Sequence, residues 1–213
     1  MTTHDDTTAM REDVYRLLAA CYYPPTGAFS EEQCCNSLAA LLADAVPEAA
    51  GHAAEASLFN DSHTPEELSV EHARLFMGPF HVVAPPYGSI YLDDSRTVMG
   101  ASTVKVADFY HANGLHLADD FHELPDHVAV ELEFMSYLSH RLRHAAASGN
   151  RTEAARLAAL QREFLTTYLL PWLEPFTRAI VDDGESPFYQ AIARCTAAFV
   201  KEDVAALATI SHG

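Results

Sequence analysis

The amino-acid sequence predicts an all-α protein. Apolar residues recur at the spacing of one helical face, and residues that start or stop helices separate these stretches at regular intervals. Outside one central loop, no stretch alternates apolar and polar residues over the length of a strand. The chain has 213 residues, of which 49% are hydrophobic, which is enough for one sizeable core. We therefore predict a single helical domain over residues 1–213.

Two helices are predicted before residue 47. The first has apolar residues at positions i, i+3, i+4 and i+7, which are Val14, Leu17, Leu18 and Cys21. Pro24 and Pro25 end this helix because proline cannot continue it. Ser30 and Gln33 have the spacing of a capping box, so a second helix is expected from there to Pro47.

Two further helices lead to the centre of the chain. An alanine-rich helix is expected over about residues 48–58. Thr64 then has the position of an N-cap, with Pro65 at the first helical position and Glu67 completing a capping box. The apolar face of this fourth helix contains Leu68, His72, Leu75 and Phe76. Gly78 and Pro79 end it.

Residues 78–103 interrupt the helical pattern. Pro79, Pro85 and Pro86 fix φ and disfavour the α region for the residues before them, so we predict an ordered loop without helix. The loop also carries large apolar side chains, namely Phe80, Tyr87, Ile90, Tyr91 and Leu92. Because solvated loops rarely expose so many, we interpret this loop as the wall of a groove.

Six helices are predicted after the loop, each with a start or stop signal. The signals are Ser102 with Asn113-Gly114, Pro125 with Gly149, Thr152, Pro171 with Gly184, Ser186-Pro187, and Lys201. The helix with Pro125 at its first position and Asp126 in its first turn is expected to be the longest and to form the spine of the fold.

Composition narrows the class of protein. No run of eighteen apolar residues appears and the first residues are polar, so neither a membrane span nor a secretory signal is expected. The four cysteines lack CxxC spacing, which is typical of a reduced, cytoplasmic protein. The formal net charge of -17 disfavours nucleic acid and favours a basic peptide as partner. Acidity of this kind also serves solubility, and both interpretations stay open.

Motifs for catalysis are sparse. The sequence contains no P-loop, no nucleophile elbow and no Glu-x-x-His motif of the di-iron bundles. His140 and His144 are one helical turn apart, but they lie near a helix C-terminus, where a charged imidazole is favourable without a metal. His127 and Glu131 share a helix face beside Asp126. An alternative function is therefore a metal-dependent helical hydrolase or oxidase that uses these two residues.

Several motifs, taken together and in order, resemble a known family. They are Glu71–Pro79 (Glu-His-Ala-Arg-Leu-Phe-Met-Gly-Pro), Ala84–Tyr91 (Ala-Pro-Pro-Tyr-Gly-Ser-Ile-Tyr), Val98–Gly100, Glu123–His127 (Glu-Leu-Pro-Asp-His) and Glu131–Met135. This combination resembles the TorD/DmsD family of redox-enzyme maturation chaperones, which is related to the NarJ group. The segment Phe164–Trp172 looks like the C-terminal helix pair of that family, except that Tyr168 stands where a histidine is common.

The resemblance implies an all-helical cytoplasmic protein with no catalytic activity and no cofactor of its own. Such a protein binds the twin-arginine leader of a molybdopterin oxidoreductase subunit and holds the apo-subunit until its cofactor is inserted, before export by the Tat translocase. By position, the resemblance implies leader contacts from Leu75, Phe76, Pro86, Tyr87, Tyr91, Gly100, Glu123, Asp126 and His127. GTP binding has been suggested for the family, but no local motif supports it here. The client enzyme stays open, as does the choice between a monomer and a domain-swapped dimer.

The residues themselves are compatible with that role. A twin-arginine leader is a basic segment followed by an apolar one, so its receptor needs carboxylates beside an apolar groove. Carboxylates are available from Glu123, Asp126, Asp93 and Asp94. Tyr87 and Tyr91 suit a half-solvated groove, because their rings have a polar tip. For Leu75 and Phe76 the residues themselves favour a core position over a ligand-facing one, and for Gly100 and Pro86 a role in a turn is the simplest interpretation.

Overall fold

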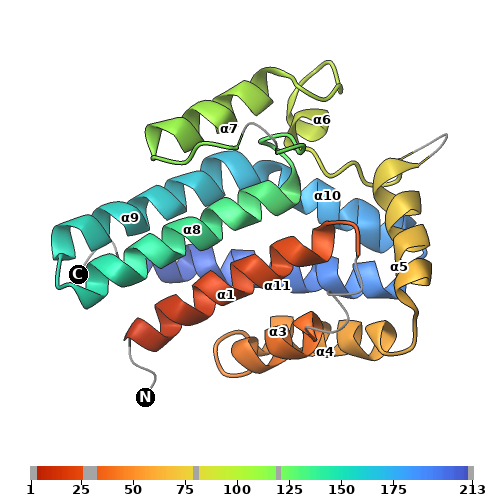
Figure 1. Ribbon diagram of the computed structural model, residues 1–213, viewed down its shortest axis with the longest axis horizontal. Coiled ribbons are helices and arrows are strands. Elements are labelled where there is room, and N and C mark those ends of the chain that lie inside the picture. Colours follow the sequence, from red (N-terminus) through yellow and green to blue (C-terminus); the bar gives the residue numbers. More distant parts are fainter. Residues whose placement is uncertain (1–3, 26–32, 79–81, 119–120, 211–213) are drawn as a thin grey trace.

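A computed structural model describes residues 4–25, 33–78, 82–118 and 121–210 (Figure 1). These residues form helices and connecting turns and contain no strand, which confirms the all-α prediction. Within the same ranges, an isolated antiparallel bridge joins Tyr87 to His127. No helix in the described part of the chain is both long and apolar enough to cross a membrane.

The centre of the molecule is built from long helices packed side by side. Helix α1 (His4–Tyr22) lies along α8 (Val128–Ala147), and α8 also packs on α9 (Arg151–Phe164) (Figure 1). Helix α11 (Pro187–Ile210) packs behind them on α10 (Leu170–Asp183). The largest side chains of these helices are fully buried between them, including Trp172, Tyr15, Tyr22, Tyr189, Phe134 and Phe164. The predicted apolar face of the first helix is buried among them, and it consists of Val14, Leu17, Leu18 and Cys21.

Two layers flank this centre. Helices α3 (Cys34–Leu42) and α4 (Pro47–Asn60) pair with each other, and α4 also packs on α11. On the opposite edge lie the short α6 (Gly88–Leu92) and α7 (Ala101–Ala112) (Figure 1). The segment between α4 and α6 joins the two layers.

Helix α5 (Pro65–His72) continues into one π-helical turn, η1 (Ala73–Met77). The predicted capping box is confirmed: the backbone N–H of Glu67 donates to Thr64 Oγ1 at 3.2 Å, and the backbone N–H of Thr64 donates to Glu67 Oε2 at 2.8 Å. The predicted apolar face is buried, and it consists of Leu68, His72, Leu75 and Phe76. Gly78, with φ of 37°, ends the segment in a conformation that favours glycine.

The central loop is not free of helix, contrary to the prediction. Helix α6 forms inside it because Asp126, far along the chain, accepts the backbone N–H of Ser89 at 2.8 Å and so satisfies a donor of the first turn. A capping residue 37 positions away leaves no local signal in the sequence. Phe80, which we predicted to be part of the groove wall, lies outside the described residues.

Three predicted helix starts were wrong. Helix α8 begins at Val128, with His127 as its N-cap, rather than at Pro125. Helix α9 has Asn150 as its N-cap rather than Thr152, and Asn150 Oδ1 accepts from the backbone N–H of Glu153 at 3.1 Å. The predicted second helix begins after Gln33, which has φ of 49°. Its predicted cap, Ser30, lies outside the described residues.

Helix α11 corrects two further predictions. Helix α11 has 24 residues and α8 has 20, so α8 is not the longest helix. Helix α11 also continues through Lys201, where we had predicted that a separate helix begins. The polar sequence near Lys201 was misleading because Asp203 points inward: its side chain is buried in an ion pair with Arg11 of α1. Tyr15 also donates to Asp203 Oδ2, at 2.7 Å, and Arg11 donates to Gln161 of α9 at 2.6 Å. This buried network ties three helices together.

The four cysteines are buried where α1, α3 and α11 meet, and none forms a disulfide. A hydrogen bond with Cys35, together with burial, raises the pKa of the Cys21 thiol well above its usual value. Burial raises the pKa of Cys195 to about 12. The thiols therefore behave as small apolar groups in the core, as the sequence predicted.

Candidate functional site

The two proline motifs of the sequence meet at the N-terminus of α8. The backbone N–H of Gly88 donates to the carbonyl of Asp126 at 2.8 Å, and that of Val128 donates to the carbonyl of Pro86 at 2.9 Å. Tyr87 and His127 face each other as an isolated bridge. This pairing fixes the side chains of the loop relative to α8, because backbone hydrogen bonds hold the two chain segments together.

His127 is enclosed between two tyrosine rings. Its ring is stacked on Tyr23 with centroids 5.9 Å apart, and Tyr87 contacts it edge-on at 5.2 Å. Nδ1 accepts the backbone N–H of Ala129 at 3.2 Å, which caps α8. Burial, with a smaller contribution from nearby His72, lowers the pKa of His127 to about 4. The imidazole is therefore neutral at pH 7 and acts as a support for the two rings.

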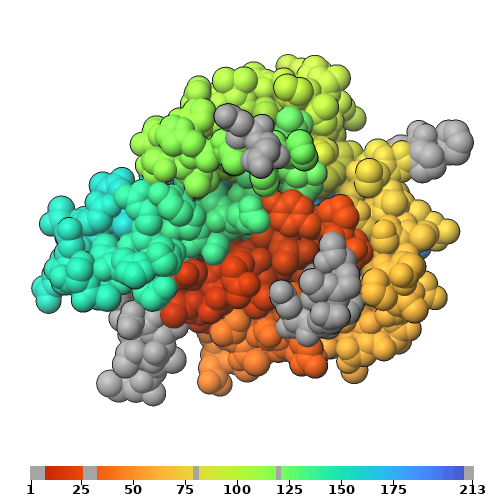
Figure 2. Space-filling model, viewed as in Figure 1, coloured from red at the N-terminus to blue at the C-terminus, as the bar shows by residue number. Residues whose placement is uncertain are grey.

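The surface over His127 carries two pairs of a tyrosine and a glutamate. Tyr87 donates to Glu123 Oε2 at 3.2 Å, and Tyr23 donates to Glu133 Oε2 at 3.2 Å. Both tyrosines and Glu123 are half-buried, whereas Glu133 is exposed. We call these four residues the tyrosine–glutamate cluster. In Figure 2 the end of α1 (red), the start of α8 (green) and the segment around α5 (yellow) lie next to one another on the face where these elements meet.

The cluster is electrostatically negative and aromatic. Burial raises the pKa of Tyr87 to about 12, and the charge of Glu123 contributes to that rise. Burial and then the charge of Glu133 raise the pKa of Tyr23, and Glu123 adds to this as well. Carboxylates beside aromatic faces match the requirements of a guanidinium group, which bonds to the former and stacks on the latter.

Asp126 lies under the loop rather than at its surface. Only 1% of the residue is exposed, and its carboxylate accepts the backbone N–H of Ser89. Its backbone carbonyl also accepts from Gly88. In this position Asp126 holds α6 against the start of α8 and so positions Tyr87.

Glu131 is buried on the inner side of α8. Its Oε2 accepts the indole N–H of Trp172 at 3.2 Å, and burial raises its pKa well above the usual value, so the carboxyl is neutral. Tyr91 stacks on Trp172 with centroids 5.8 Å apart. Gly88 completes this contact, because a Cβ there would lie 3.0 Å from the indole nitrogen.

The metal-site alternative finds no support in these positions. Glu131 is bonded to an indole, and His127 is enclosed by tyrosines. Over the ranges that the structure describes, no group of three or more His, Cys, Asp or Glu side chains could hold a metal ion. Three such ligands are the minimum of a catalytic zinc site.

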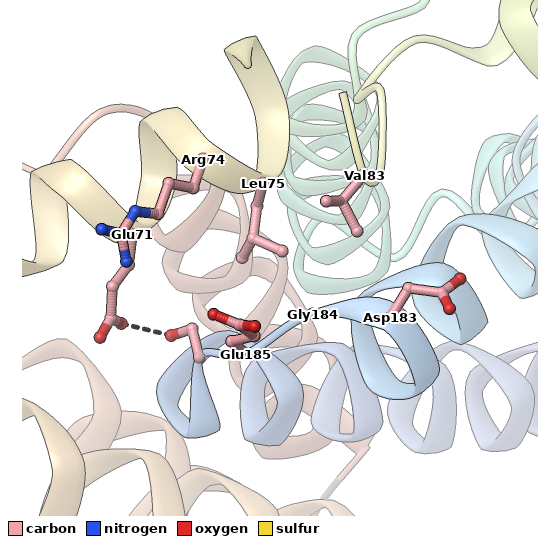
Figure 3. Close-up of a pocket in the computed structure, with 8 residues that line it drawn as sticks. Glu71, Arg74, Leu75, Val83, Asp183, Gly184 and Glu185 are labelled. Carbon is pink, nitrogen blue, oxygen red and sulfur yellow. Dashed lines mark hydrogen bonds between the residues drawn. The ribbon is translucent and has the colours of Figure 1, made fainter. Parts of the chain in front are cut away.

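The remaining predicted site residues lie apart from the cluster. Phe76 is in the core, with its ring next to those of Tyr22, His72 and Tyr189. Leu75 is also buried, and its side chain lines a separate cavity (Figure 3).

Gly100 marks a tight turn. A Cβ there would collide with the carboxylate of Asp93, which accepts from the backbone N–H and the hydroxyl of Ser102 at 3.2 and 3.0 Å. Asp93 thus satisfies a backbone donor in the first turn of α7.

The structure therefore brings together Tyr87, Glu123 and His127 and places Pro86 and Asp126 beneath them. It also adds two residues that the sequence analysis missed, Tyr23 and Glu133. Tyr23 follows α1 directly and Glu133 is 110 positions away, so only the packing of α1 along α8 relates them. No sequence signal connected this pair.

An all-helical fold of this kind is known from a solved structure. A protein from Archaeoglobus fulgidus, described as a candidate redox enzyme maturation protein, superimposes with a TM-score of 0.62 and 23% identity, covering 94% of this chain and 96% of that one. Residues 36–178 match the family model described as nitrate reductase delta subunit. Because this match covers more than half of the chain, the protein belongs to that family.

Curated relatives agree with this assignment. The Tat proofreading chaperone DmsD of Salmonella typhi is 29% identical over 131 residues, which are 62% of this chain and 57% of the relative. The chaperone protein TorD of Vibrio cholerae is 28% identical over 141 residues, which are 64% of this chain and 60% of the relative. The match thus spans less than two thirds of the length of these relatives. It confirms the resemblance to the TorD/DmsD family, whose members are named as chaperones and not as enzymes.

Proposed function

We propose that this protein is a cytoplasmic chaperone that binds the twin-arginine leader of a molybdopterin oxidoreductase catalytic subunit. It assists cofactor insertion and folding of that subunit before Tat export, and residues 1–213 act as one domain in this role. The relatives named as a Tat proofreading chaperone and as TorD support the class of function. The observation that carries the binding site is the tyrosine–glutamate cluster.

The cluster suits the basic part of a leader. Each glutamate accepts a hydrogen bond from a neutral tyrosine hydroxyl. An arginine guanidinium that binds the carboxylate replaces the tyrosine–glutamate bond with a charge-assisted hydrogen bond, which is stronger. The guanidinium can then stack on the ring of the same tyrosine. The two glutamates belong to different elements, so two neighbouring arginines can each find a carboxylate.

The apolar part of a leader needs a neighbouring surface. Phe121 and Leu124 are half-buried and flank Glu123 in sequence. Burying a few such side chains contributes about 25 cal/mol per Å², from which the ordering of the peptide subtracts. The resulting affinity is in the micromolar range, which suits a chaperone that must release its client.

Calorimetry with a synthetic twin-arginine leader tests the proposal. The wild-type protein is expected to bind it, and Glu123→Gln/Glu133→Gln to bind roughly tenfold or more weakly, because two charge-assisted bonds are lost. Tyr87→Ala is expected to weaken binding as well. The control Glu163→Gln/Glu202→Gln makes the same change in net charge at exposed positions of α9 and α11.

Two results would reject the assignment. One is a wild-type protein that binds no leader of a molybdoenzyme. The other is a control variant that loses as much affinity as the cluster variant, because the effect would then come from net charge alone. Circular dichroism of each variant separates loss of binding from loss of fold.

A further inference from the structure

The cavity that Leu75 lines lies between η1 and the junction of α10 and α11 (Figure 3). Its volume is about 260 Å³. It is lined by Glu71, Arg74, Leu75, Val83, Asp183, Gly184, Glu185 and Ser186. We call it the corner pocket. It is smaller than the usual 300–1,000 Å³ of a cofactor or drug site, so it fits one extended side chain.

The floor of the pocket is apolar and fixed in place. Leu75 and Val83 project toward Gly184 (Figure 3). The backbone N–H of Ala84 donates to the carbonyl of Leu75 at 2.9 Å, which holds the loop on η1. A Cβ at Gly184 would collide with the carbonyl of Ile180 and lie 3.0 Å from Leu75 Cδ2. Glycine thus lets the turn after α10 approach Leu75 closely.

The rim of the pocket carries three carboxylates in two different states. The carboxylate of Glu71 is engaged, because Ser186 donates a hydrogen bond to it (Figure 3). His63 Nε2 also lies 3.8 Å from Glu71 Oε1. Asp183 and Glu185 are exposed, and neither carboxylate makes a hydrogen bond or an ion pair with the part of the chain that the structure describes. These two acids are therefore available to a ligand.

The position of Asp183 also favours a cation. It is the last residue of α10, a helix of 14 residues with no basic residue in its last turn. The carbonyl end of a helix carries partial negative charge, so an acid there is unfavourable until a positive charge approaches. A bound cation would relieve that repulsion.

A neighbouring hollow of about 460 Å³ is almost wholly apolar, and Val70, Ala73, Arg74, Met77 and Gly78 line it. Val70 and Met77 are 52% and 66% exposed, and together they line this hollow. Because Arg74 borders both hollows, they are adjacent. The surface therefore offers acidic and apolar contacts side by side.

We propose that the corner pocket is a second subsite for the leader, and that it accepts one arginine side chain that the tyrosine–glutamate cluster does not hold. The stem of an arginine lies along Leu75 and Val83, and its guanidinium reaches Asp183 and Glu185. An apolar residue next to that arginine occupies the hollow at Val70 and Met77. The identity of the occupant rests on the proposed function, whereas the preference for a cation rests on the pocket itself.

A small probe tests the pocket independently of any leader. Nα-acetyl-arginine methylamide is titrated into the ¹⁵N-labelled full chain, with the citrulline analogue as a neutral match. The arginine probe is expected to cause saturable amide shifts at Leu75, Gly184 and Glu185, and the citrulline probe none. Asp183→Asn/Glu185→Gln is expected to weaken the arginine probe about fivefold or more. Absence of saturable shifts, or equal shifts with citrulline, overturns the inference.

A variant of Arg74 distinguishes a pocket that binds cations from one that binds anions. Arg74→Gln removes the positive charge from the rim, so it is expected to strengthen binding of the arginine probe. A pocket that binds anions through Arg74 would instead lose affinity for N-acetyl-aspartate and gain none for arginine, and that result overturns the inference. For the double variant Asp183→Asn/Glu185→Gln the matched control is Asp44→Asn/Glu163→Gln, since both of these residues are exposed and lie outside the lining of the pocket.

The leader then tests the occupant. Affinity of a synthetic twin-arginine leader for Asp183→Asn/Glu185→Gln is expected to fall more than for the control. A leader that binds the wild type and both variants equally overturns the subsite and leaves the proposed function standing. A leader that fails to bind the wild type rejects the proposed function, and the arginine probe alone then decides whether the pocket accepts a cation.

Discussion

His127 and Glu131 are ionisable residues that the fold keeps uncharged, for opposite reasons. Burial lowers the pKa of the histidine and raises that of the glutamate, because in both cases the charged form loses its hydration. One residue supports the two tyrosines at the surface, and the other accepts the indole of Trp172 inside. Both are thus positioning residues whose influence on stability depends on pH.

His127 predicts a loss of stability in mild acid. Its pKa is about 4 in the folded chain and about 6.5 in the unfolded chain, so below pH 6.5 protons bind first to the unfolded state. The contribution of a neutral His127 is present above pH 6.5 and is lost between pH 6.5 and 4, by roughly 3 kcal/mol at most. His127→Asn keeps an N-cap acceptor and cannot titrate. Urea unfolding at several pH values should show a flatter dependence for this variant; an unchanged slope contradicts the prediction.

Glu131 predicts a change in the opposite direction. Because its pKa is raised in the folded chain, its contribution is fully present below about pH 4.5 and decreases as the pH rises. Glu131→Gln preserves an acceptor for Trp172 without a titratable group. The variant is therefore expected to gain stability relative to wild type as the pH rises from 4.5 to 8, measured by thermal melting. Glu131→Leu is the control, since it leaves the indole N–H unbonded at a cost of about 1–3 kcal/mol.

The sequence motifs predicted part of the geometry of the candidate site. Tyr87, Glu123 and His127 do lie together, because their motifs pair through the backbone. Tyr91 shares the motif of Tyr87 but stacks on Trp172, and Leu75 comes from a separate motif and lines another cavity. Motif membership specifies a segment, whereas the direction of each side chain depends on packing.

Local sequence predicted some helix boundaries correctly and missed others. Thr64 was predicted correctly because its capping box is complete within four residues. The start of α6 was missed because its acceptor is Asp126, and the continuation of α11 was missed because the partner of Asp203 is in α1. Local signals therefore fail where a distant residue supplies the missing contact.

The N-terminus of α9 offers a direct test of one corrected boundary. Asn150 accepts the backbone N–H of Glu153, and Thr152 is an exposed residue inside the helix. Asn150→Ala is expected to lower the free energy of unfolding by about 1 kcal/mol. Thr152→Ala is expected to leave it unchanged or to raise it slightly, since alanine has the higher helix propensity. Equal losses in both variants, measured by urea unfolding, would contradict the assignment of Asn150 as the cap.

The buried network around Arg11 contributes to the stability of the whole molecule. This residue of α1 pairs with Asp203 of α11 and bonds to Gln161 of α9, and all three are at most 4% exposed. Removing one partner of a buried ion pair leaves a charge without compensation. Asp203→Ala is accordingly expected to cost about 3–5 kcal/mol, seen as a large fall in melting temperature. Asp13→Ala, which breaks an exposed pair with Arg16, should cost little by comparison.

The net charge of -17 predicts that the rate at which a basic ligand associates with the protein depends on salt. Long-range attraction raises the rate of association, and salt screens it over about 8 Å at physiological ionic strength. The association rate of a twin-arginine leader is expected to fall steeply between 50 and 500 mM salt, while its dissociation rate changes less. Stopped-flow fluorescence measures both. A rate of association that does not depend on salt would mean that the acidic surface serves solubility alone.

The four cysteines at the junction of α1, α3 and α11 have a practical consequence. None is more than 2% exposed, so a thiol reagent can reach them only when those helices separate. The rate of alkylation in native buffer therefore reports how often the centre of the protein opens. If leader binding slows that reaction, the chain itself records, without any added label, how much a bound client stabilises its chaperone.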